Sequence, residues 1–439
     1  LMFKTEIGVS GKQTGFMRPE TAQGIFIAFK RISRFYKDKL PFGIVQLGKS
    51  YRNELSPRQG VIRLREFTQA EAEIFVDPSD KTHKNYKNIE NHVLHLYNQK
   101  EQLNEGKPIE ITVKDAIDNN IVSSEMLIYQ IVIAHKFLRD LGIEDDVIRF
   151  RQHLPDEMAH YAIDCWDAEV KTDQYGWVEI IGIADRTDFD LKSHIKHSKE
   201  DLSVFKEYDT PKNVTVTKPS FNMKKFGPTF KGDSPKAKEI LENTDSNIIK
   251  ESFDKDGVFS FSIGENKYEI DQSFVKFETK EEQIRGDRII PHVIEPSYGI
   301  DRIIYSTLLH SYTEDETEEG EKRSYLKLPA KIAPIKAAIL PLVNKQPLTL
   351  IAEDIETTLR SSNIITSFDG SGTIGRRYAR ADEIGIPYAI TIDYDTVDDK
   401  KVTIRNRDTF KQKRVEIEKL SMIINNLVEG HINFEDIEE

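Results

Sequence analysis

The segment from Tyr51 to Phe67, YRNELSPRQGVIRLREF, constrains the fold of this chain more than any other part of the sequence. It predicts a strand, a loop and a returning strand. Arg52 and Glu54 lie two residues apart, so both side chains leave an extended strand on the same face. On the way back, Arg63 and Phe67 also share a face. Arginine binds phosphate, a carboxylate can accept from an adenine amine, and an aromatic ring can lie on a base. The spacing therefore predicts a nucleotide site, although a solvated hairpin with paired charges would carry the same residue types.

The segment from Glu295 to Tyr312 predicts a short strand, a glycine-marked turn and a helix. Arg302 falls at the start of that helix. Such turns are common, so this segment alone is weak evidence for a nucleotide site. Together with the first segment, in this order, it makes coincidence unlikely. The apolar positions at helical spacing are Ile303, Ile304, Thr307 and Leu308.

The two segments resemble motifs 2 and 3 of the class II aminoacyl-tRNA synthetases. Longer strings are similar to the glycyl-tRNA synthetases of the archaeal and eukaryotic type, over nearly the whole chain. These strings are MRPETAQGIF, FGIVQLGKSYRNELSPRQG, REFTQAEAEIF, MAHYAIDCWDAE and GWVEIIGIADRTDFDL. The resemblance implies a multidomain α+β and α/β fold: an antiparallel class II sheet flanked by helices, with insertions, and a C-terminal α/β anticodon-binding domain with a mixed sheet.

Strand-like runs and turns divide the chain. Three core parts are expected to form one sheet, while the helix-prone stretch Lys81 to Gly142 is expected to lie outside it as an insertion. The string VFSFSIGENKYEI predicts a hairpin in a second insertion, and an acidic linker, Thr313 to Arg323, precedes a domain whose alternating strands and helices indicate an α/β sheet. The expected parts are core 1–78, 151–204 and 286–325, a helical insertion 79–150, a second insertion 205–285 and the anticodon-binding domain 326–439.

The resemblance implies that glycine and ATP form glycyl-adenylate and pyrophosphate, and that glycine then passes to the 3′ end of tRNA(Gly). Because the glycine carboxylate attacks the α-phosphate, the site must concentrate positive charge. The expected catalytic residues are Arg52 at the α-phosphate, Arg63 at the γ-phosphate and Arg302 on the adenine, opposite Phe67. Mg²⁺ prefers hard oxygen ligands, and Glu179 is the predicted ligand. The expected ATP-binding set is Arg52, Asn53, Glu54, Arg63, Leu64, Arg65, Glu66, Phe67, Glu179, Ile180, Gly299, Ile300, Asp301 and Arg302.

Glycine has no side chain to grip, so selection must exclude larger amino acids. The family lines this pocket with carboxylates, and the resemblance places Glu20, Glu71 and Glu295 there, with Arg186 balancing their charge. For each carboxylate alone, a structural ion pair is the alternative. The expected glycine-binding set is Glu20, Phe67, Thr68, Gln69, Glu71, Arg186, Glu295, Ser297 and Gly299.

Composition agrees with a soluble, cytoplasmic protein. Hydrophobic residues make up 38% of the chain, and no apolar run approaches the ~20 residues that span a bilayer. The net charge of −12 argues against an RNA partner at face value, but GRRYAR is locally basic, and Arg376, Arg377 and Arg380 are the expected tRNA contacts. The glycines of this region also spell a dinucleotide fingerprint, in a domain too small for a second nucleotide-binding half. The single cysteine, Cys165, is expected to be a buried structural thiol.

Motif 1, which builds the class II dimer interface, is expected before Leu1. The chain is therefore expected to be a fragment, a processed product or half of a split enzyme, with a homodimer in the full-length enzyme. Many relatives have glycine where Asp301 stands, and Leu308 and Leu309 also depart from the family pattern. A non-catalytic nucleic-acid-binding subunit with a synthetase-like fold is the alternative function. Diadenosine tetraphosphate synthesis is a possible side activity of the same site.

Overall fold

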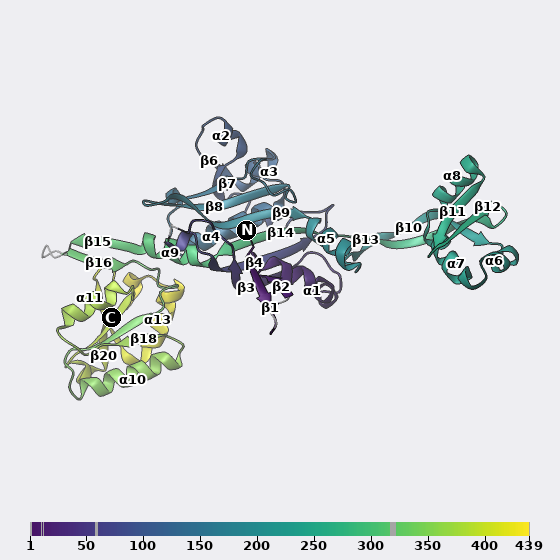
Figure 1. Cartoon of the computed structure of the whole chain (residues 1–439). Coiled ribbons are helices and arrows are strands. Elements are labelled where there is room, and N and C mark those ends of the chain that lie inside the picture. The colour runs from purple at the N-terminus through teal and green to yellow at the C-terminus, as the bar shows by residue number, and fades with distance from the viewer. Residues whose placement is uncertain (1, 10, 12, 58–59, 317–321, 439) are drawn as a thin grey trace. The chain divides into compact units, whose positions relative to one another are not determined.

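The computed structural model describes residues 2–9, 11, 13–57, 60–316 and 322–438 (Figure 1). They form two compact units, which are described separately. One unit comprises Leu1–Leu202 and Ile290–Glu439, and the other comprises Ser203–Ile289. No helix among the described residues is long and apolar enough to cross a membrane.

An eight-stranded sheet organises the first unit, in the order β3-β4-β14-β9-β8-β7-β5-β6. Its central strands come from segments far apart in the sequence, and neighbours are antiparallel except for β5 with β7. The large antiparallel part confirms the fold class expected of the core. The strands are β3 (Phe42–Tyr51), β4 (Glu66–Val76), β14 (His292–Gly299), β9 (Gly176–Thr187), β8 (Asp164–Thr172), β7 (Ile148–Gln152), β5 (Val93–Tyr97) and β6 (Ile109–Thr112).

Contrary to our expectation, the stretch Lys81 to Gly142 does not lie outside this sheet. It contributes two strands, β5 and β6, at one end of the sheet. Leu94 and Leu96 are buried while the residues between and beside them are not, which is the two-residue period of a strand. The same stretch also contains the helices α2 (Gln99–Leu103), α3 (Val113–Asp118) and α4 (Glu125–Asp140).

Helices cover both faces of the sheet because the strands alternate their apolar side chains. On β4, Ile74 packs against the core cluster that includes the buried face of α4. Phe75, on the opposite face, contacts Phe26 and Phe29, with ring centroids 6.4 and 4.8 Å apart. On the Phe75 face lie α1 (Ala22–Phe35) and α5 (Phe189–Ser198), whereas Ile303 of α9 (Ile300–Ser311) belongs to the core cluster on the α4 face. A short hairpin, β1 (Lys4–Ile7) with β2 (Gln13–Phe16), precedes α1.

The C-terminal part contains a second, mixed sheet in the order β18-β17-β19-β20-β21. β18, β17 and β19 are parallel, while β20 and β21 return antiparallel. This is the mixed α/β sheet that the sequence predicted, with β21 as an additional strand. The elements are β17 (Ala337–Pro341), α10 (Leu348–Ser361), β18 (Thr366–Phe368), α11 (Ile374–Glu383), β19 (Tyr388–Ile392), α12 (Thr396–Asp399), β20 (Lys401–Asn406), β21 (Gln412–Glu416) and α13 (Leu420–Glu429).

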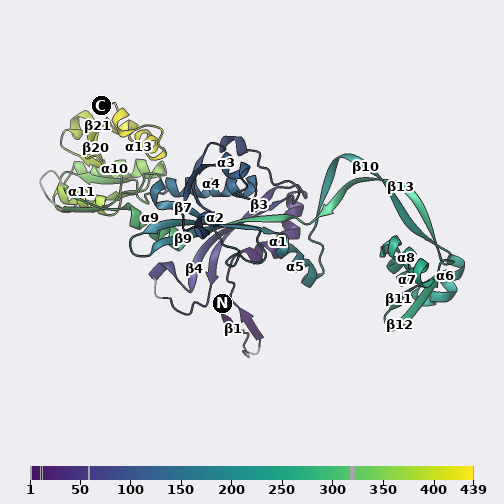
Figure 2. The ribbon, with the colours of Figure 1, turned by 90° about the horizontal axis from the view of Figure 1, so that it is seen from above.

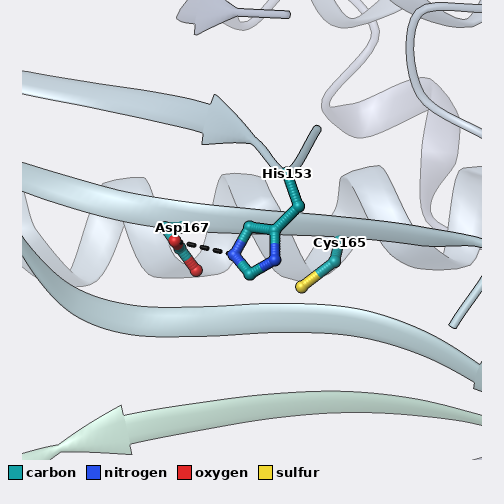
Figure 3. Close-up of side chains that lie close together, drawn as sticks. All are labelled: His153, Cys165 and Asp167. Atoms are coloured by element: carbon teal, nitrogen blue, oxygen red, sulfur yellow. Dashed lines mark hydrogen bonds and ion pairs between the residues drawn. The ribbon is translucent and has the colours of Figure 1, made fainter. Parts of the chain in front are cut away.

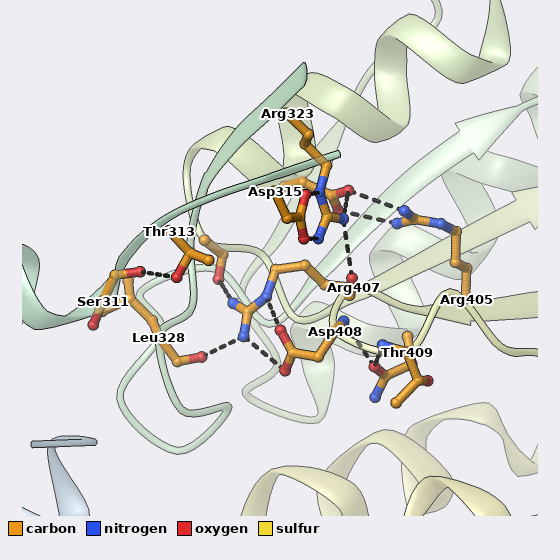
Figure 4. A network of polar contacts seen from close by, with 12 residues as sticks. Ser311, Thr313, Asp315, Arg323, Leu328, Arg405, Arg407, Asp408 and Thr409 are labelled. Atoms are coloured by element: carbon orange, nitrogen blue, oxygen red, sulfur yellow. Dashed lines mark hydrogen bonds and ion pairs between the residues drawn. The ribbon is translucent and has the colours of Figure 1, made fainter. Parts of the chain in front are cut away.

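The expected acidic linker contains two paired strands, β15 (Tyr312–Glu316) and β16 (Lys322–Leu326), and its residues 317–321 lie outside the described part. Arg323 of β16 donates to both carboxylate oxygens of Asp315, at 2.9 and 2.8 Å (Figure 4). Its guanidinium also lies 3.3 Å from Asp382 on α11, which pairs with Arg405 of β20. This buried network fastens the hairpin to the C-terminal domain.

The second unit, Ser203–Ile289, is built on a long antiparallel ribbon (Figure 2). At one end of the ribbon, short helices and a hairpin enclose a small core around Phe226, Phe230 and Leu241. The hairpin predicted from VFSFSIGENKYEI is confirmed, and Gly264 in its turn has a φ of +61°. The elements are β10 (Val204–Phe221), α6 (Met223–Phe230), α7 (Ser234–Asn243), α8 (Ser246–Asp256), β11 (Val258–Ile263), β12 (Asn266–Asp271) and β13 (Val275–Ile289).

Candidate active site

A cavity of about 260 Å³ lies against the eight-stranded sheet and collects most of the residues that the sequence singled out. It brings together both predicted motifs, which are more than 200 residues apart in the sequence. The predicted residues that line it are Glu20, Arg52, Glu54, Arg63, Leu64, Phe67, Thr68, Gln69, Glu71, Glu179, Ile180, Arg186, Glu295, Ser297, Gly299, Asp301 and Arg302.

Strand β4 supplies one wall of the cavity through alternate side chains. Phe67, Gln69 and Glu71 share a face because they are two residues apart. On the neighbouring strand β14, Ser297 lies opposite Glu71 and Gly299 lies opposite Gln69. The register of these two strands therefore places the adenine-binding and glycine-binding candidates in one continuous row.

Glu71 is held in place by donors from two directions. It accepts hydrogen bonds from the backbone N–H and the hydroxyl of Thr21, and from the N–H of Ala22 at 3.2 Å, where α1 begins. The Ser297 hydroxyl donates to its other oxygen at 3.0 Å. These donors hold the Glu71 carboxylate in one orientation on the pocket wall.

Arg186 is the cation at the centre of the carboxylate-lined end of the cavity. Its guanidinium donates to Asp190 at 2.8 Å and to Glu295 at 2.5 Å, and it lies 3.5 Å from Glu20. Burial alone would lower the pKa of Arg186, but the carboxylates Glu295, Glu20 and Asp190 raise it. Tyr161 covers the guanidinium, with its ring centroid 4.5 Å away. Three carboxyl groups thus surround one guanidinium, and this acidic wall would suit an ammonium group.

The arginines of the two motifs lie at the other end. The Arg52 guanidinium lies 5.4 Å from the centroid of the Phe67 ring and donates to the carbonyl of Pro19 at 3.2 Å. Arg302 donates to the carbonyl of Ile62 at 2.9 Å and to that of Glu179 at 2.7 Å. These contacts tie α9 to the segment before β4 and to β9, so Arg302 is held in a fixed position on the cavity.

Asp301, one of the departures from the family pattern, accepts a hydrogen bond from the backbone N–H of Thr68 at 2.5 Å. It thus joins the start of α9 to β4. The Glu179 carboxylate lies 3.3 Å from Arg302, and its side chain is 52% exposed. An exposed carboxylate on the cavity wall is a chemically suitable oxygen ligand for Mg²⁺.

Four predicted ATP contacts do not line the cavity: Asn53, Arg65, Glu66 and Ile300. Arg65 is exposed and donates to the carbonyl of Glu54 at 3.1 Å, while Glu66 lies 3.6 Å from Lys49. Arg65 and Glu66 extend the strand alternation of Phe67, but their side chains serve the hairpin itself.

Sequence reasoning missed a cluster on the wall formed by β7 and β8 (Figure 3). Nε2 of His153 lies 2.8 Å from Asp167, which raises the pKa of His153, while Nδ1 is buried without a partner among the described residues. Cys165 shares the wall and is partly buried, so the expectation of a fully buried structural thiol was wrong. The two-residue spacing of Cys165 and Asp167 in MAHYAIDCWDAE was the available signal.

The nitrogen, sulfur and oxygen atoms of this cluster lie within 4.8 Å of one another, as in a metal site. Burial raises the pKa of the Cys165 thiol, and the negative charge of Asp167 raises it further. Both effects favour the protonated thiol, whereas zinc binds the thiolate. The His153–Asp167 hydrogen bond also engages a ring nitrogen. The cluster therefore fits a hydrogen-bonded wall better than a soft-metal centre.

Comparison with known proteins identifies the family. Residues 3–304 match the family described as "tRNA synthetase class II core domain (G, H, P, S and T)", and residues 336–427 match "Anticodon binding domain". The glycine–tRNA ligase of Methanothermobacter thermautotrophicus is 54% identical over 420 residues, covering 96% of this chain and 73% of that protein. Those of Methanocaldococcus jannaschii and Methanothrix thermoacetophila are 51% and 48% identical, covering 96% and 99% of this chain and 73% and 74% of theirs. This chain belongs to the glycine–tRNA ligase family.

Membership of the glycine–tRNA ligase family confirms the resemblance seen in the sequence. The two family matches also confirm the expected class II core and anticodon-binding domain. In the anticodon-binding domain, the structure separates the three arginines that we expected to contact tRNA. Arg377 is 2% exposed and donates to the carbonyls of Pro341, Leu342 and Gly372, so its expected RNA contact was wrong. Arg380 pairs with Asp369, and Arg376 is exposed.

Proposed function

We propose that this chain activates glycine with ATP and transfers it to tRNA(Gly). The observation that carries the proposal is one row of side chains across β4 and β14, with the Phe67 and Arg302 end in the same cavity as Glu71, Ser297 and Glu295. Cationic and aromatic groups at one end suit a nucleotide, and clustered carboxylates at the other suit an ammonium group.

In the proposed first step, Arg52, which lies beside Phe67, neutralises the approach of the glycine carboxylate to the α-phosphate. Arg63 binds the outer phosphates, while Phe67 and Arg302 hold the adenine between them. Glu54 accepts from the adenine amino group. The fixed position of Arg302, bonded to two carbonyls, supports this role because it needs little reorganisation during the reaction.

At the amino-acid end, Glu20, Glu71 and Glu295 attract the ammonium group of glycine. Ser297 and Gln69 complete a polar wall, since the Gln69 amide donates to Ser297 at 3.3 Å. A methyl group there would displace or desolvate these polar groups, which costs more than the lost contact alone. This is the proposed basis for rejecting alanine.

Mg²⁺, when bound, would neutralise the leaving pyrophosphate, and Glu179 is the proposed ligand. Glu179 also contacts Arg302 through its side chain and its backbone carbonyl. The residue therefore connects the proposed metal position with the adenine-binding arginine. Replacing Glu179 with Gln should raise the Mg²⁺ concentration needed for half-maximal activity.

We propose that the protein forms a homodimer. The edge strand β3 exposes Val45 and Leu47, at 71% and 67% of their surface. Exposed apolar residues on an edge strand are suited to pairing with another chain. Sedimentation equilibrium of the wild type and of Val45→Lys tests this, and a concentration-independent monomer in both would contradict it.

The activation step is tested by amino-acid-dependent exchange of pyrophosphate into ATP. Glycine should support exchange while alanine and serine do not, and Arg52→Ala should abolish it. Arg31→Ala, an exposed arginine on α1, is the matched control and should leave the rate unchanged. Failure of glycine to support exchange, together with binding of tRNA, would favour a non-catalytic nucleic-acid-binding subunit.

A further inference from the structure

Glu73 is a carboxyl group buried directly behind the glycine end of the cavity. Its side chain is 0% exposed, and neither oxygen accepts a hydrogen bond from any described residue. It follows Glu71 by two residues on β4, so it shares the pocket face one row deeper. The next residue of that row is Phe75, which is packed among aromatic rings. Glu73 therefore lies between the pocket and the apolar core.

The group across from Glu73 is another carboxyl. The β4–β14 register pairs Ile294 with Ile74 and Ser297 with Glu71, which sets Glu295 opposite Glu73. On the other side, β3 places Ile44 opposite Glu73 and offers no charge. The available cation, Arg186, already binds Glu295, Asp190 and Glu20. The carboxyl groups of Glu73 and Glu295 thus face each other. The nearest cation, Arg186, is bonded to Glu295 and not to Glu73.

A charged carboxylate without donors is not sustained at zero exposure, because transfer of an unpaired charge from water is prohibitive. Burial raises the pKa of Glu73 well above its ordinary value, and the nearby Glu295 raises it further, against the opposing effect of Arg186. Burial also raises the pKa of Glu295, to about 7. Arg186 binds the Glu295 carboxylate and no described residue donates to Glu73, so a proton held by this facing pair belongs on Glu73. A protonated carboxyl is a donor, and Glu295 is the acceptor that faces it.

We propose that Glu73 is a neutral carboxylic acid that donates a hydrogen bond to Glu295 and thereby positions the Glu295 carboxylate for the ammonium group of glycine. This inference rests on the proposed function, because the role of Glu295 toward glycine belongs to that proposal. Glu73 does not line the cavity and acts through Glu295, so it is a positioning residue.

The arrangement explains how five carboxyl groups coexist around one arginine. Asp190 and Glu295 are bonded to Arg186, and Glu71 is bonded to Thr21, Ala22 and Ser297. A fifth charge would repel the others, whereas a neutral acid supplies a donor instead. With Arg186 on one side and Glu73 on the other, Glu295 is held from two directions. Glu295 also lines the cavity.

The test compares two substitutions of similar size in the full chain. Glu73→Gln keeps a donor toward Glu295, and Glu73→Met removes it. In glycine-dependent ATP–pyrophosphate exchange, Glu73→Gln should keep the glycine KM within about twofold, while Glu73→Met should raise it about tenfold or more. The ATP KM should stay unchanged in both. Phe75→Leu, one row further along β4, controls for general loosening of the core and should lower stability without changing the glycine KM.

Infrared spectroscopy tests the protonation separately from catalysis. At neutral pH, the difference between the wild type and Glu73→Gln should contain the carbonyl band of a protonated carboxylic acid. Absence of that band overturns the proposal, as does a glycine KM that Glu73→Met leaves unchanged, or one that Glu73→Gln raises as much as Glu73→Met. If Glu73→Met does not fold, the proposal is tested by the glycine KM of Glu73→Gln and by the infrared band of the wild type. Lack of glycine-dependent exchange in the wild type would instead refute the proposed function, and the band would still report on Glu73.

Discussion

The hydroxyl of Ser297 donates a hydrogen bond to Glu71 at 3.0 Å, between residues that face each other in the β14–β4 register. The same hydroxyl accepts from the amide of Gln69 at 3.3 Å. A single serine therefore connects two neighbouring positions of β4, and it does so inside the proposed glycine site.

Replacement of Ser297 with Ala should weaken glycine binding. The buried Glu71 loses one of its donors, and a hydrogen bond to a charged group contributes ~1.5–3 kcal/mol, equivalent to a rise in the glycine KM of about tenfold or more. Steady-state exchange kinetics measure this. Ser362→Ala, at the end of α10, is the control, and equal effects of both substitutions would contradict the role of Ser297.

Replacement of Arg302 with Lys should impair ATP use more than glycine use. Lysine cannot bridge the carbonyls of Ile62 and Glu179 and lie flat on a base at the same time. The ATP KM should rise about tenfold, while the glycine KM changes by less than about threefold. Arg31→Lys serves as the conservative control. A larger change in the glycine KM would place Arg302 elsewhere in the site.

Arg376 and Arg377 should give opposite results despite being adjacent. Arg377→Ala leaves buried carbonyls without their donor, so the free energy of unfolding should fall by ~2 kcal/mol or more. Arg376→Ala should leave stability unchanged and raise the tRNA KM in aminoacylation. Denaturant titration and aminoacylation kinetics measure the two quantities. If Arg377→Ala affected only the tRNA KM, the buried position of its guanidinium would be contradicted.

The Asp393–Arg414 pair should make the stability of the anticodon-binding domain depend on acid. Hydrogen bonds from Arg414, at 2.7 and 3.1 Å, lower the pKa of Asp393 to about 2. A pKa lowered by folding gives stability that is present above the unfolded pKa, ~3.9, and is lost as the pH falls toward about 2. Asp393→Asn should therefore be less stable than the wild type at pH 7. The two denaturation midpoints should converge as the pH falls through this window, and a constant difference would contradict the assignment.

Local spacing was enough to predict one side of the site. Phe67 lies on the cavity because strand alternation fixes the side on which a residue emerges. Arg52 and Glu54 also line the cavity, but they follow the end of β3 at Tyr51, so the strand predicted for them was wrong although their position on the site was not. Proximity between strands was not readable in the same way. His153 meets Asp167 only because β7 lies beside β8, and the sequence of neither strand specifies its neighbour. The resemblance, not the local pattern, carried the prediction that the two motifs meet.

Two errors did have a readable signal. Leu94 and Leu96 alternate as in a strand, but the surrounding polar residues made the stretch look helical and peripheral. Arg377 is buried with Ala381, four residues later, on one face of α11. Helical spacing therefore distinguishes Arg377 from its neighbour Arg376, whereas basic composition alone treats the two arginines as equivalent.

The row on β4 has a consequence for how this enzyme can change in length. Phe67, Gln69, Glu71 and Glu73 succeed one another at two-residue intervals, so the spacing of β4 sets the distances between the proposed base-binding, glycine-binding and positioning residues. Insertion or deletion of a single residue within β4 would move the side chains on one side of the change to the opposite face of the sheet, which packs against α4. Such a variant would lose the proposed contacts to both substrates together. We therefore expect β4 to tolerate substitutions but not changes in length.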